Sequence, residues 1–344
     1  MDSEIDVVYT WADGTDLKFR KEMCACLHDL AASPHSSSFQ PGRFRDNGEL
    51  RYSLRSLEKF APWVRKVFIV TNGDAPTWLN VSDDRVSVIA HDLIFTRKSD
   101  IPTFNTNAIE ANLHRIPDLS RRFLYFNDDV FLGRPVSLED FVTPSGGQYL
   151  YVDHVLPTEI PEEFIVDRAQ SYMRSLIEEI CGRQISRLMP AHVPHLFDRE
   201  ILCRLEQLLS EQFRETSSHK FRSSNDVVLA TLYYLYVSEV LGCESGYQYR
   251  FLAPRQSFLP FSGLQDYAMA VLTEQTWKMV RGLFAIRAFQ PKFFSINDDL
   301  GEVSSQHPSF IFLRSLLYSY FPKRCPFERS TKSESAKRER FLLG

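Results

Sequence analysis

Two adjacent carboxylates follow an apolar run in the middle of the chain. Residues 122–126 (RFLYF) are predicted to form a strand, and they run directly into Asn-Asp-Asp at 127–129. A second apolar run, at 292–296 (KFFSI), leads into another Asn-Asp-Asp at 297–299. Carboxylates at a strand end can bind Mg²⁺ or Mn²⁺, which then bridges a substrate diphosphate. The alternative is a polar turn that satisfies only backbone groups. The candidate metal ligands are Asp128, Asp129 and Asp299.

Two histidines could supply a general base. His192 and His195 lie in the sequence His-Val-Pro-His, just before a predicted helix. An imidazole titrates near neutral pH, so it can take a proton from a hydroxyl nucleophile. The spacing does not match a zinc motif. A pair of structural histidines in a loop is the alternative interpretation.

A basic, hydroxyl-rich segment at 217–226 (SSHKFRSSND) precedes another predicted helix. The first turn of a helix, together with Lys220 and Arg222, would suit a phosphate group. The alternative is that Ser224 or Asn225 caps the helix and that the charges are solvated.

Two further carboxylates, Glu49 and Glu110, each have a structural alternative. Glu110 stands three residues after Asn107, and Glu49 stands three residues after Asp46. This is the spacing of a capping box, in which the acid satisfies a backbone N–H at the start of a helix. From spacing alone, capping is the favoured interpretation of Glu110.

The elements that must position these groups alternate between strand and helix. Strands are predicted at 5–10, 66–71, 85–90 and 122–126, and helices at 46–61 and 107–116. This alternation predicts an α/β fold in which helices flank a mostly parallel, Rossmann-like sheet. Ligands of such sheets bind beyond the carboxyl ends of the strands. Because Asp13, Asn72 and the 127–129 segment all follow strand ends, this edge is predicted to carry the site.

The chain is expected to form one catalytic domain over residues 1–325, followed by a charged, solvated tail at 326–344. A Ser- and Pro-rich loop is predicted at 31–42, and an insertion or cap at 131–190. Further helices are predicted at 168–180, 198–213 and 225–241, the last of them ended by Gly242. The C-terminal half is therefore expected to be largely helical.

Composition excludes several classes of protein. The 344 residues are 44% hydrophobic and 24% charged, as in an ordinary globular protein, and the net charge of −4 argues against a nucleic-acid partner. The longest apolar run, 227–241, is too short and too polar to span a membrane, so no transmembrane segment is expected. The first residues lack the features of a signal peptide, which favours a cytoplasmic protein, with the inner membrane face as one location and a Golgi lumenal fragment as the alternative. The sequence does not decide whether the protein forms a homodimer.

Four blocks of the chain match, in order, the pattern of a known enzyme family. They are residues 5–14 (IDVVYTWADG), residues 45–53 (RDNGELRYS) continuing through 102–104 (PTF) to 126–130 (FNDDV), residues 192–195 (HVPH) continuing to 220–222 (KFR), and residues 293–299 (FFSINDD). In these blocks the chain resembles the Stealth family of sugar-phosphate transferases. That family includes the catalytic subunit of N-acetylglucosamine-1-phosphotransferase and bacterial capsule enzymes.

The resemblance implies a nucleotide-sugar transferase-like fold and a set of site residues. The implied catalytic residues are Glu110, Asp129, His192 and Arg222. The resemblance therefore favours a site role for Glu110 over helix capping alone, and it favours His192 over His195 as the catalytic histidine. The residues expected to bind the donor are Trp11, Asp13, Asn72, Arg51 and Lys220. The implied substrates are a UDP-sugar and a glycan or polysaccharide acceptor, with Mg²⁺ or Mn²⁺ as cofactor.

On this basis the expected reaction is transfer of a sugar-1-phosphate, with N-acetylglucosamine-1-phosphate or hexose-1-phosphate as the group transferred. Arg222 would neutralise the phosphate that bears the sugar, and His192 would deprotonate the acceptor hydroxyl. UMP would leave, and the sugar C1–O bond would stay intact. One alternative is a metal-dependent glycosyltransferase that breaks this bond and releases UDP. The other is a glycan-binding module without catalysis.

Overall fold

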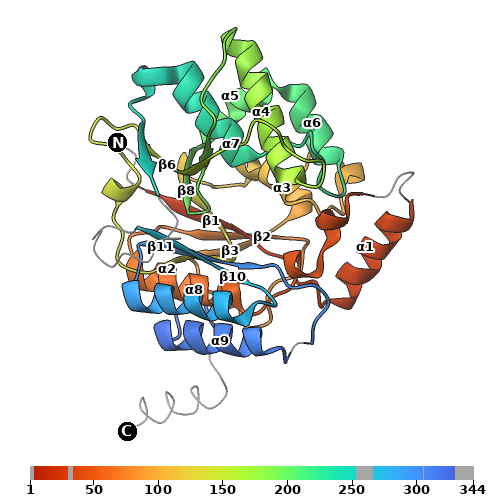
Figure 1. Ribbon diagram of the computed structural model, residues 1–344, viewed down its shortest axis with the longest axis vertical. Helices are drawn as coiled ribbons and strands as arrows, with labels where there is room; N and C mark the ends of the chain where they lie inside the picture. Colours follow the sequence, from red (N-terminus) through yellow and green to blue (C-terminus); the bar gives the residue numbers. More distant parts are fainter. Residues whose placement is uncertain (1–3, 30–33, 253–265, 305, 330–344) are drawn as a thin grey trace.

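A five-stranded sheet forms the centre of the computed structural model, which describes residues 4–29, 34–252, 266–304 and 306–329. β1 (Asp6–Thr10) lies between β2 (Val67–Thr71) and β4 (Arg122–Asn127) and pairs with both in parallel. β3 (Val86–Ala90) extends the parallel sheet beyond β2, and β8 (His195–Asp198) pairs antiparallel with β4. The order β3-β2-β1-β4-β8 confirms the predicted α/β fold with a mostly parallel, Rossmann-like sheet (Figure 1).

Both faces of this sheet are covered, which explains why its strands are apolar throughout. Successive side chains of a strand point to opposite faces. Val7 and Tyr9 of β1 enter one hydrophobic core, and Val8 between them enters the other. Every residue of β1 and β2 is buried. Parallel strands buried on both faces read as continuous hydrophobic runs, so the strands at 5–10 and 66–71 could be recognised in the sequence.

Helices form a layer on each side of the sheet (Figure 1). One layer consists of α2 (Glu49–Phe60), α8 (Thr276–Phe289) and α9 (Pro308–Tyr320). The other consists of α3 (Thr106–Glu110), α4 (Ile165–Cys181), α5 (Arg199–Leu208), α6 (Ser210–Ser218) and α7 (Leu229–Leu235). α1 (Leu17–Asp29) lies at the side of the molecule (Figure 1). Within the described ranges, no helix is both long enough and apolar enough to cross a bilayer.

Two smaller sheets complete the fold. One has the order β10-β11-β5, and its strands are β10 (Tyr267–Leu272), β11 (Phe293–Asp298) and β5 (Val130–Leu132). The other has the order β7-β6-β9, and its strands are β7 (Leu188–Pro190), β6 (Tyr149–Val155) and β9 (Gln248–Phe251). Helices α4–α9 bear out the helical C-terminal half, but strands β7–β11 lie between them, and only the last of these strands was expected from the sequence.

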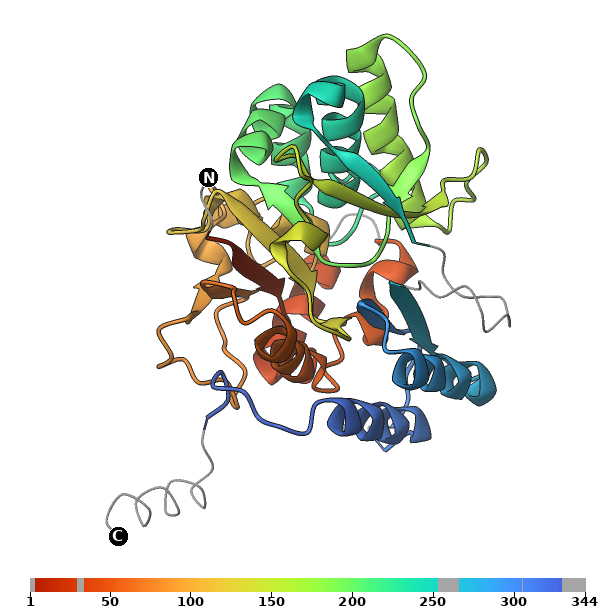
Figure 2. The same cartoon turned by 90° about the vertical axis from the view of Figure 1, so that its left-hand side faces the viewer.

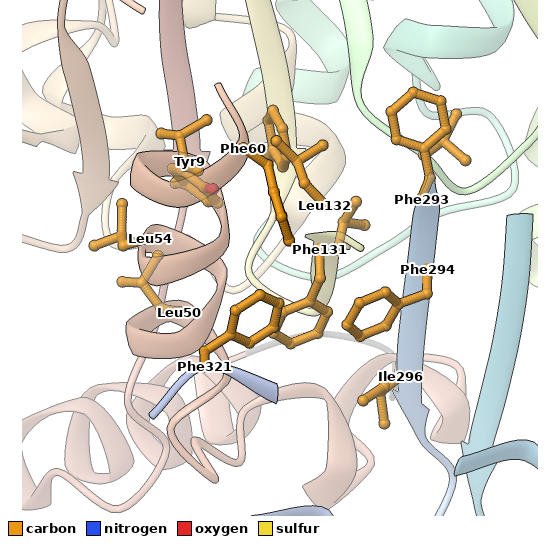
Figure 3. Close-up of a cluster of buried hydrophobic side chains, with 14 of the residues drawn as sticks. Tyr9, Leu50, Leu54, Phe60, Phe131, Leu132, Phe293, Phe294, Ile296 and Phe321 are labelled. Atoms are coloured by element: carbon orange, nitrogen blue, oxygen red, sulfur yellow. The ribbon is translucent and has the colours of Figure 1, made fainter. Parts of the chain in front are cut away.

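An aromatic stack joins the elements that lead into and out of the two Asn-Asp-Asp segments. Phe131 of β5 stacks on Phe294 of β11 with ring centroids 4.8 Å apart, and Phe294 lies parallel to Phe321 at 6.4 Å. Figure 3 shows these rings between the side chains of α2 and β11. Such aromatic pairs contribute about 0.5–1.5 kcal/mol each beyond the burial of their area. The stack therefore fixes segments 127–129 and 297–299 next to each other.

Some predicted helix boundaries are wrong. The N-cap of α3 is Asn105 rather than Asn107, so Glu110 is not part of a capping box. The helix predicted from residue 225 begins at Leu229 and ends in a π-helical turn, Tyr236–Leu241. The Asp226 side chain does not cap the start of this helix, because its carboxylate accepts hydrogen bonds from Asn105 and Asn107. The single helix predicted at 198–213 is interrupted at Leu209.

Two predicted irregular segments are partly ordered. Of the loop expected at 31–42, residues 31–33 lie outside the described residues, and the rest includes 3₁₀ turns at Ser36–Phe39 and Pro41–Arg43. Of the tail expected at 326–344, residues 330–344 lie outside the described residues. Residues 326–329 do not belong to a solvated tail, because Glu328 is only 6% exposed.

A buried ion pair holds the end of the described chain on α2. Both carboxylate oxygens of Glu328 accept hydrogen bonds from the Arg55 guanidinium, at 2.7 and 2.8 Å. Arg55 also donates to the backbone carbonyl of Phe321. Burial by itself raises the pKa of Glu328, but the hydrogen bonds and charge of Arg55, with help from Arg51, hold it below the ordinary value of 4.5.

Replacing Glu328 by Gln should destabilise the protein at neutral pH by roughly 3–5 kcal/mol, because the Arg55 charge would stay buried without its counter-ion. A carboxylate with a lowered pKa stabilises the fold above the pKa of the unfolded chain, and this contribution is lost as the pH falls through the folded pKa. The difference between parent and Glu328→Gln in urea unfolding should therefore shrink below about pH 4.5. A difference that is constant with pH would contradict the ion-pair explanation, and Glu302→Gln, at an exposed position, is the control.

Candidate active site

The carboxyl edge of the central sheet opens into a cavity of about 490 Å³. Each parallel strand supplies part of its wall where the strand ends: Thr10 and Trp11 after β1, Asn72 after β2, His91 after β3, and the 127–129 segment after β4. The chain order reverses between β1 and β4, and this switch point is where open α/β sheets bind ligands. The cavity therefore lies at the edge that the sequence predicted.

His192 and Asp129 form a hydrogen-bonded pair in this cavity. β8 runs antiparallel to β4, with His195 opposite Tyr125, so the chain just before β8 reaches the same edge. Nε2 of His192 lies 3.0 and 3.2 Å from the two carboxylate oxygens of Asp129. A carboxylate can only accept, so Nε2 carries the ring proton and Nδ1 is left as the basic nitrogen. This is the arrangement of a general base oriented by a carboxylate.

The electrostatic surroundings of the two histidines differ. Burial by itself lowers the pKa of His192, but Asp129 and Glu110 raise it above the ordinary value of 6.5. His195 is deeply buried, its Nδ1 lies 3.0 Å from the hydroxyl of Tyr234, and burial lowers its pKa to about 3. His195 is thus a neutral, structural histidine, and only His192 lines the cavity.

Glu110 lies behind the cavity wall and not in it. Its carboxylate accepts a hydrogen bond of 2.8 Å from the hydroxyl of Tyr125, which in turn accepts one from Asn127. Burial raises the pKa of Glu110, and the nearby charges of Arg222 and His192 partly offset this effect. Glu110 can therefore influence the cavity wall in two ways, through its hydrogen bond with Tyr125 and through its electrostatic interaction with Arg222 and His192.

A buried carboxylate shapes the loop that presents Arg222. Asp226 is fully buried and accepts hydrogen bonds from Asn105 and Asn107 of the α3 start and from the backbone N–H of Ser223. His219 donates to its other oxygen at 2.7 Å. The loop from 219 to 226 thus closes around Asp226. Arg222 projects from this loop into the cavity and donates to the hydroxyl of Thr106 at 3.3 Å.

Two further arginines, Arg43 and Arg45, enter the cavity wall from the loop before α2. This loop packs tightly on the second Asn-Asp-Asp segment: a Cβ on Gly42 would come within 2.4 Å of the carbonyl oxygen of Asp298. Arg45 forms an ion pair with the Asp298 carboxylate at 2.6 Å. Burial, and then the positive charge of Arg222, lower the pKa of Arg43 to about 10. Neither arginine was predicted as a site residue, because nothing in the local sequence connects them with residue 222.

Several carboxylates also crowd at the cavity. Burial, then the charges of Asp129, Glu49 and Asp46, raise the pKa of Asp128 well above its ordinary value. Burial and the charge of Asp46 raise the pKa of Glu49 to about 8. Crowded oxygen ligands of this kind suit a hard divalent cation. However, among the residues that the structure describes, no three His, Cys, Asp or Glu side chains converge as a ready-made metal site.

Besides Glu110, three of the sequence-selected residues lie outside the cavity wall. Arg51 forms an ion pair with Glu328 and stacks on Trp78. Asp13 accepts hydrogen bonds from the following turn, at Thr15. Lys220 lines a second, open cavity of about 660 Å³, which also includes Arg222 in its wall. The structure brings together the others: Trp11, Asn72, Asp128, Asp129, His192, Arg222 and Asp299 all line the first cavity.

His91 is a wall residue that the sequence analysis missed. It is 7% exposed, and its Nε2 has no hydrogen-bond partner within the described part of the chain. Burial lowers its pKa to about 4, so the ring is neutral. The available signal was its position, immediately after the strand predicted at 85–90. A neutral ring nitrogen at this edge can donate to, or accept from, a polar ligand.

Comparisons with known proteins agree with the pattern found in the sequence. Residues 43–150 match Stealth protein conserved region 2, and residues 191–239 match conserved region 3. Exopolysaccharide phosphotransferase SCO6023 of Streptomyces coelicolor is 35% identical over 336 residues, which are 96% of this chain and 53% of that protein. Exopolysaccharide phosphotransferase CpsY of Mycobacterium tuberculosis is 32% identical over 243 residues, which are 70% of this chain and 45% of that protein.

The chain therefore belongs to the Stealth family, as predicted, and it spans about half the length of these curated relatives. Among solved structures, galactosyltransferase LgtC aligns with a TM-score of 0.42 and 11% identity, covering 97% of this chain and 100% of LgtC. This similarity is too low to support an argument about function.

Replacing Asp226 by Asn should lower the free energy of unfolding by roughly 2–4 kcal/mol, because an amide cannot accept from all four donors and His219 loses its counter-charge. Chemical denaturation measures the effect. Asp29→Asn, at an exposed position on α1, serves as the matched control and should change the stability little. Equal stabilities of the two variants would mean that Asp226 does not organise the Arg222 loop.

Proposed function

We propose that this protein transfers a sugar-1-phosphate from a UDP-sugar to a hydroxyl of an acceptor glycan, as the names of its exopolysaccharide phosphotransferase relatives suggest. One observation carries the proposal. The oriented pair His192–Asp129 and the facing cations Arg222 and Arg43 share one cavity at the switch point of the sheet. A phosphoryl transfer needs this combination, a base for the nucleophile and fixed positive charge for the phosphate oxygens.

The nucleoside of the donor is assigned to the part of the cavity between β1 and β3. Trp11, Asn72 and His91 meet there at the ends of three adjacent strands. Trp11 offers an aromatic surface, and Asn72 and His91 offer neutral hydrogen-bonding groups, which suits a base and a ribose. The diphosphate would then extend past the end of β4 towards Arg222 and Arg43.

Mg²⁺ or Mn²⁺ fits this arrangement as a cofactor bound together with the donor. Asp128 and Asp299 would hold the ion. Asp129 would contribute less to its binding, because both of its carboxylate oxygens lie within hydrogen-bonding distance of His192. Mg²⁺ is commonly bound by one or two carboxylates and completed by substrate phosphates, so a full set of protein ligands is not required. When bound, the ion would supply charge neutralisation at the diphosphate.

The chain's own residues would carry the proton and the charge. Nδ1 of His192 takes the proton from the acceptor hydroxyl, whose oxygen attacks the phosphorus that bears the sugar. The bond from this phosphorus to the UMP oxygen breaks, and Arg222 and Arg43 stabilise the charge on the phosphoryl oxygens. The sugar C1–O bond is not broken, so the anomeric configuration is retained. Asp129 keeps the imidazole oriented and stabilises its charged form.

The acceptor glycan is assigned to the second cavity. This cavity shares Arg222 with the first one, so a ligand there can reach the transferred phosphate. Its wall combines the apolar side chains of Pro34 and Ile165 with polar groups such as Glu162 and Arg168. Mixed apolar and hydrogen-bonding surfaces suit a sugar ring with its hydroxyls.

Incubation of the protein with UDP-N-acetylglucosamine, Mg²⁺ or Mn²⁺ and a panel of glycans should release UMP, and the release should depend on the acceptor. Chromatography of the nucleotides separates UMP from UDP. UDP as the product would establish glycosyl transfer instead, with cleavage of the C1–O bond. If neither nucleotide forms with this or other UDP-sugars, while a glycan binds without metal, a binding module would replace the enzyme.

His192→Ala should reduce the transfer rate by about 10²- to 10⁴-fold, the usual contribution of a positioned base, while the thermal unfolding curve stays close to that of the parent. Since the base must be neutral, and since Asp129 and Glu110 raise the pKa of His192, the parent's rate should increase with pH through a pKa above 6.5. His195→Asn, which removes the structural imidazole, should change stability more than the pH profile. A full rate in folded His192→Ala would exclude His192 as the base.

A further inference from the structure

The outer surfaces of α8 and α9 are apolar, although both helices lie at the surface of the molecule. On α8, Trp277, Val280 and Phe284 are 63%, 40% and 70% exposed. Their spacing of three and seven residues places them on one face of the helix. On α9, Ile311 and Tyr318 are 55% and 61% exposed and again lie seven residues apart. An exposed apolar surface of this extent marks an interaction site.

These helices have a second apolar face that the core already uses. Met279, Leu283 and Ile286 of α8 are buried, as are the core side chains of α9. Both helices thus carry apolar side chains on the side that faces solvent as well as on the side that faces the core. Core packing therefore explains the inner faces of α8 and α9, and it leaves the outer faces unexplained.

The charged residues of these two helices are all basic. α8 carries Lys278, Arg281 and Arg287, α9 carries Arg314, and neither helix contains an Asp or Glu. The nearest acidic residues in sequence, Glu274 and Glu302, lie outside both helices. The whole chain has a net charge of −4, so this concentration of positive charge is local. Lys and Arg together with Trp and Phe on one helix are typical of helices that lie in the interface of an anionic membrane.

We propose that α8 and α9 form a docking surface for a membrane that contains anionic lipids. The two helices lie side by side at the end of the molecule opposite α4–α6 (Figures 1 and 2). A second copy of the chain fits this surface poorly, because a symmetric contact would bring the basic faces together. The segment 330–344 is no better complement, since it contains four basic and two acidic residues.

Co-sedimentation of the full 344-residue chain with vesicles tests the surface without any enzymatic readout. The protein should bind vesicles of phosphatidylglycerol and phosphatidylcholine in a 3:7 ratio much more strongly than vesicles of phosphatidylcholine alone, and salt should weaken the binding. Trp277→Ser with Phe284→Ser should reduce the partition coefficient at least tenfold. Lys278→Gln with Arg281→Gln should reduce it by about 25-fold, or about fivefold for each charge removed.

The control replaces two other exposed apolar side chains, on the opposite layer, Phe164→Ser with Leu208→Ser, and should leave vesicle binding unchanged. Unfolding curves identify any variant that has lost its fold. Equal binding of the α8 variant and the control, or no binding of the parent to anionic vesicles, would overturn the proposal. The proposal would also be overturned if the parent is a dimer and the Trp277→Ser, Phe284→Ser variant is a monomer that binds vesicles as strongly as the parent.

Discussion

The parallel pairing of β1 with β2 on one side and with β4 on the other is the constraint on which the active site depends. Parallel strands send their carboxyl ends to one edge, so residues that lie tens of positions apart in the chain meet there. Thr10 and Asn127 are direct partners in this register, and they stand at the floor of the cavity. The antiparallel β8 then brings His192 to the same edge, because its first residues lie opposite the last residues of β4.

The local sequence was sufficient for the parts of this arrangement that depend on hydrophobic patterning. The buried strands are continuous apolar runs, and polar residues directly after them had to lie at the carboxyl edge. Position after a strand therefore identified Asn72 and the 127–129 segment correctly as wall residues. The same rule would have identified His91, but a single histidine after a strand carried no chemical motif that singled it out.

The remaining residues are placed by contacts that the sequence does not contain. Arg51 belongs to a block that resembles the Stealth family, yet in the structure it forms an ion pair with Glu328. Glu328 had been predicted to lie in a solvated tail. Asp226 resembled a helix start, but it is the acceptor for donors more than one hundred residues earlier. Arg43 faces Arg222 only because Gly42 allows its loop to lie against the backbone of Asp298. In each case a long-range hydrogen bond or a close backbone approach decides the outcome over the local propensity.

The cavity holds groups of like charge close together in a poorly solvated space, and this is costly in a folded protein. Burial, and then the positive charge of Arg222, lower the pKa of Arg43. Burial, and then the charges of neighbouring carboxylates, raise the pKa values of Asp128 and Glu49. Neither cluster is needed for the core, which is built from apolar side chains on both faces of the sheet. A ligand that carries both a negative diphosphate and a positive ion would relieve both repulsions at once. Strain of this kind is often retained where it is used, and the proposed donor with its divalent ion would account for it.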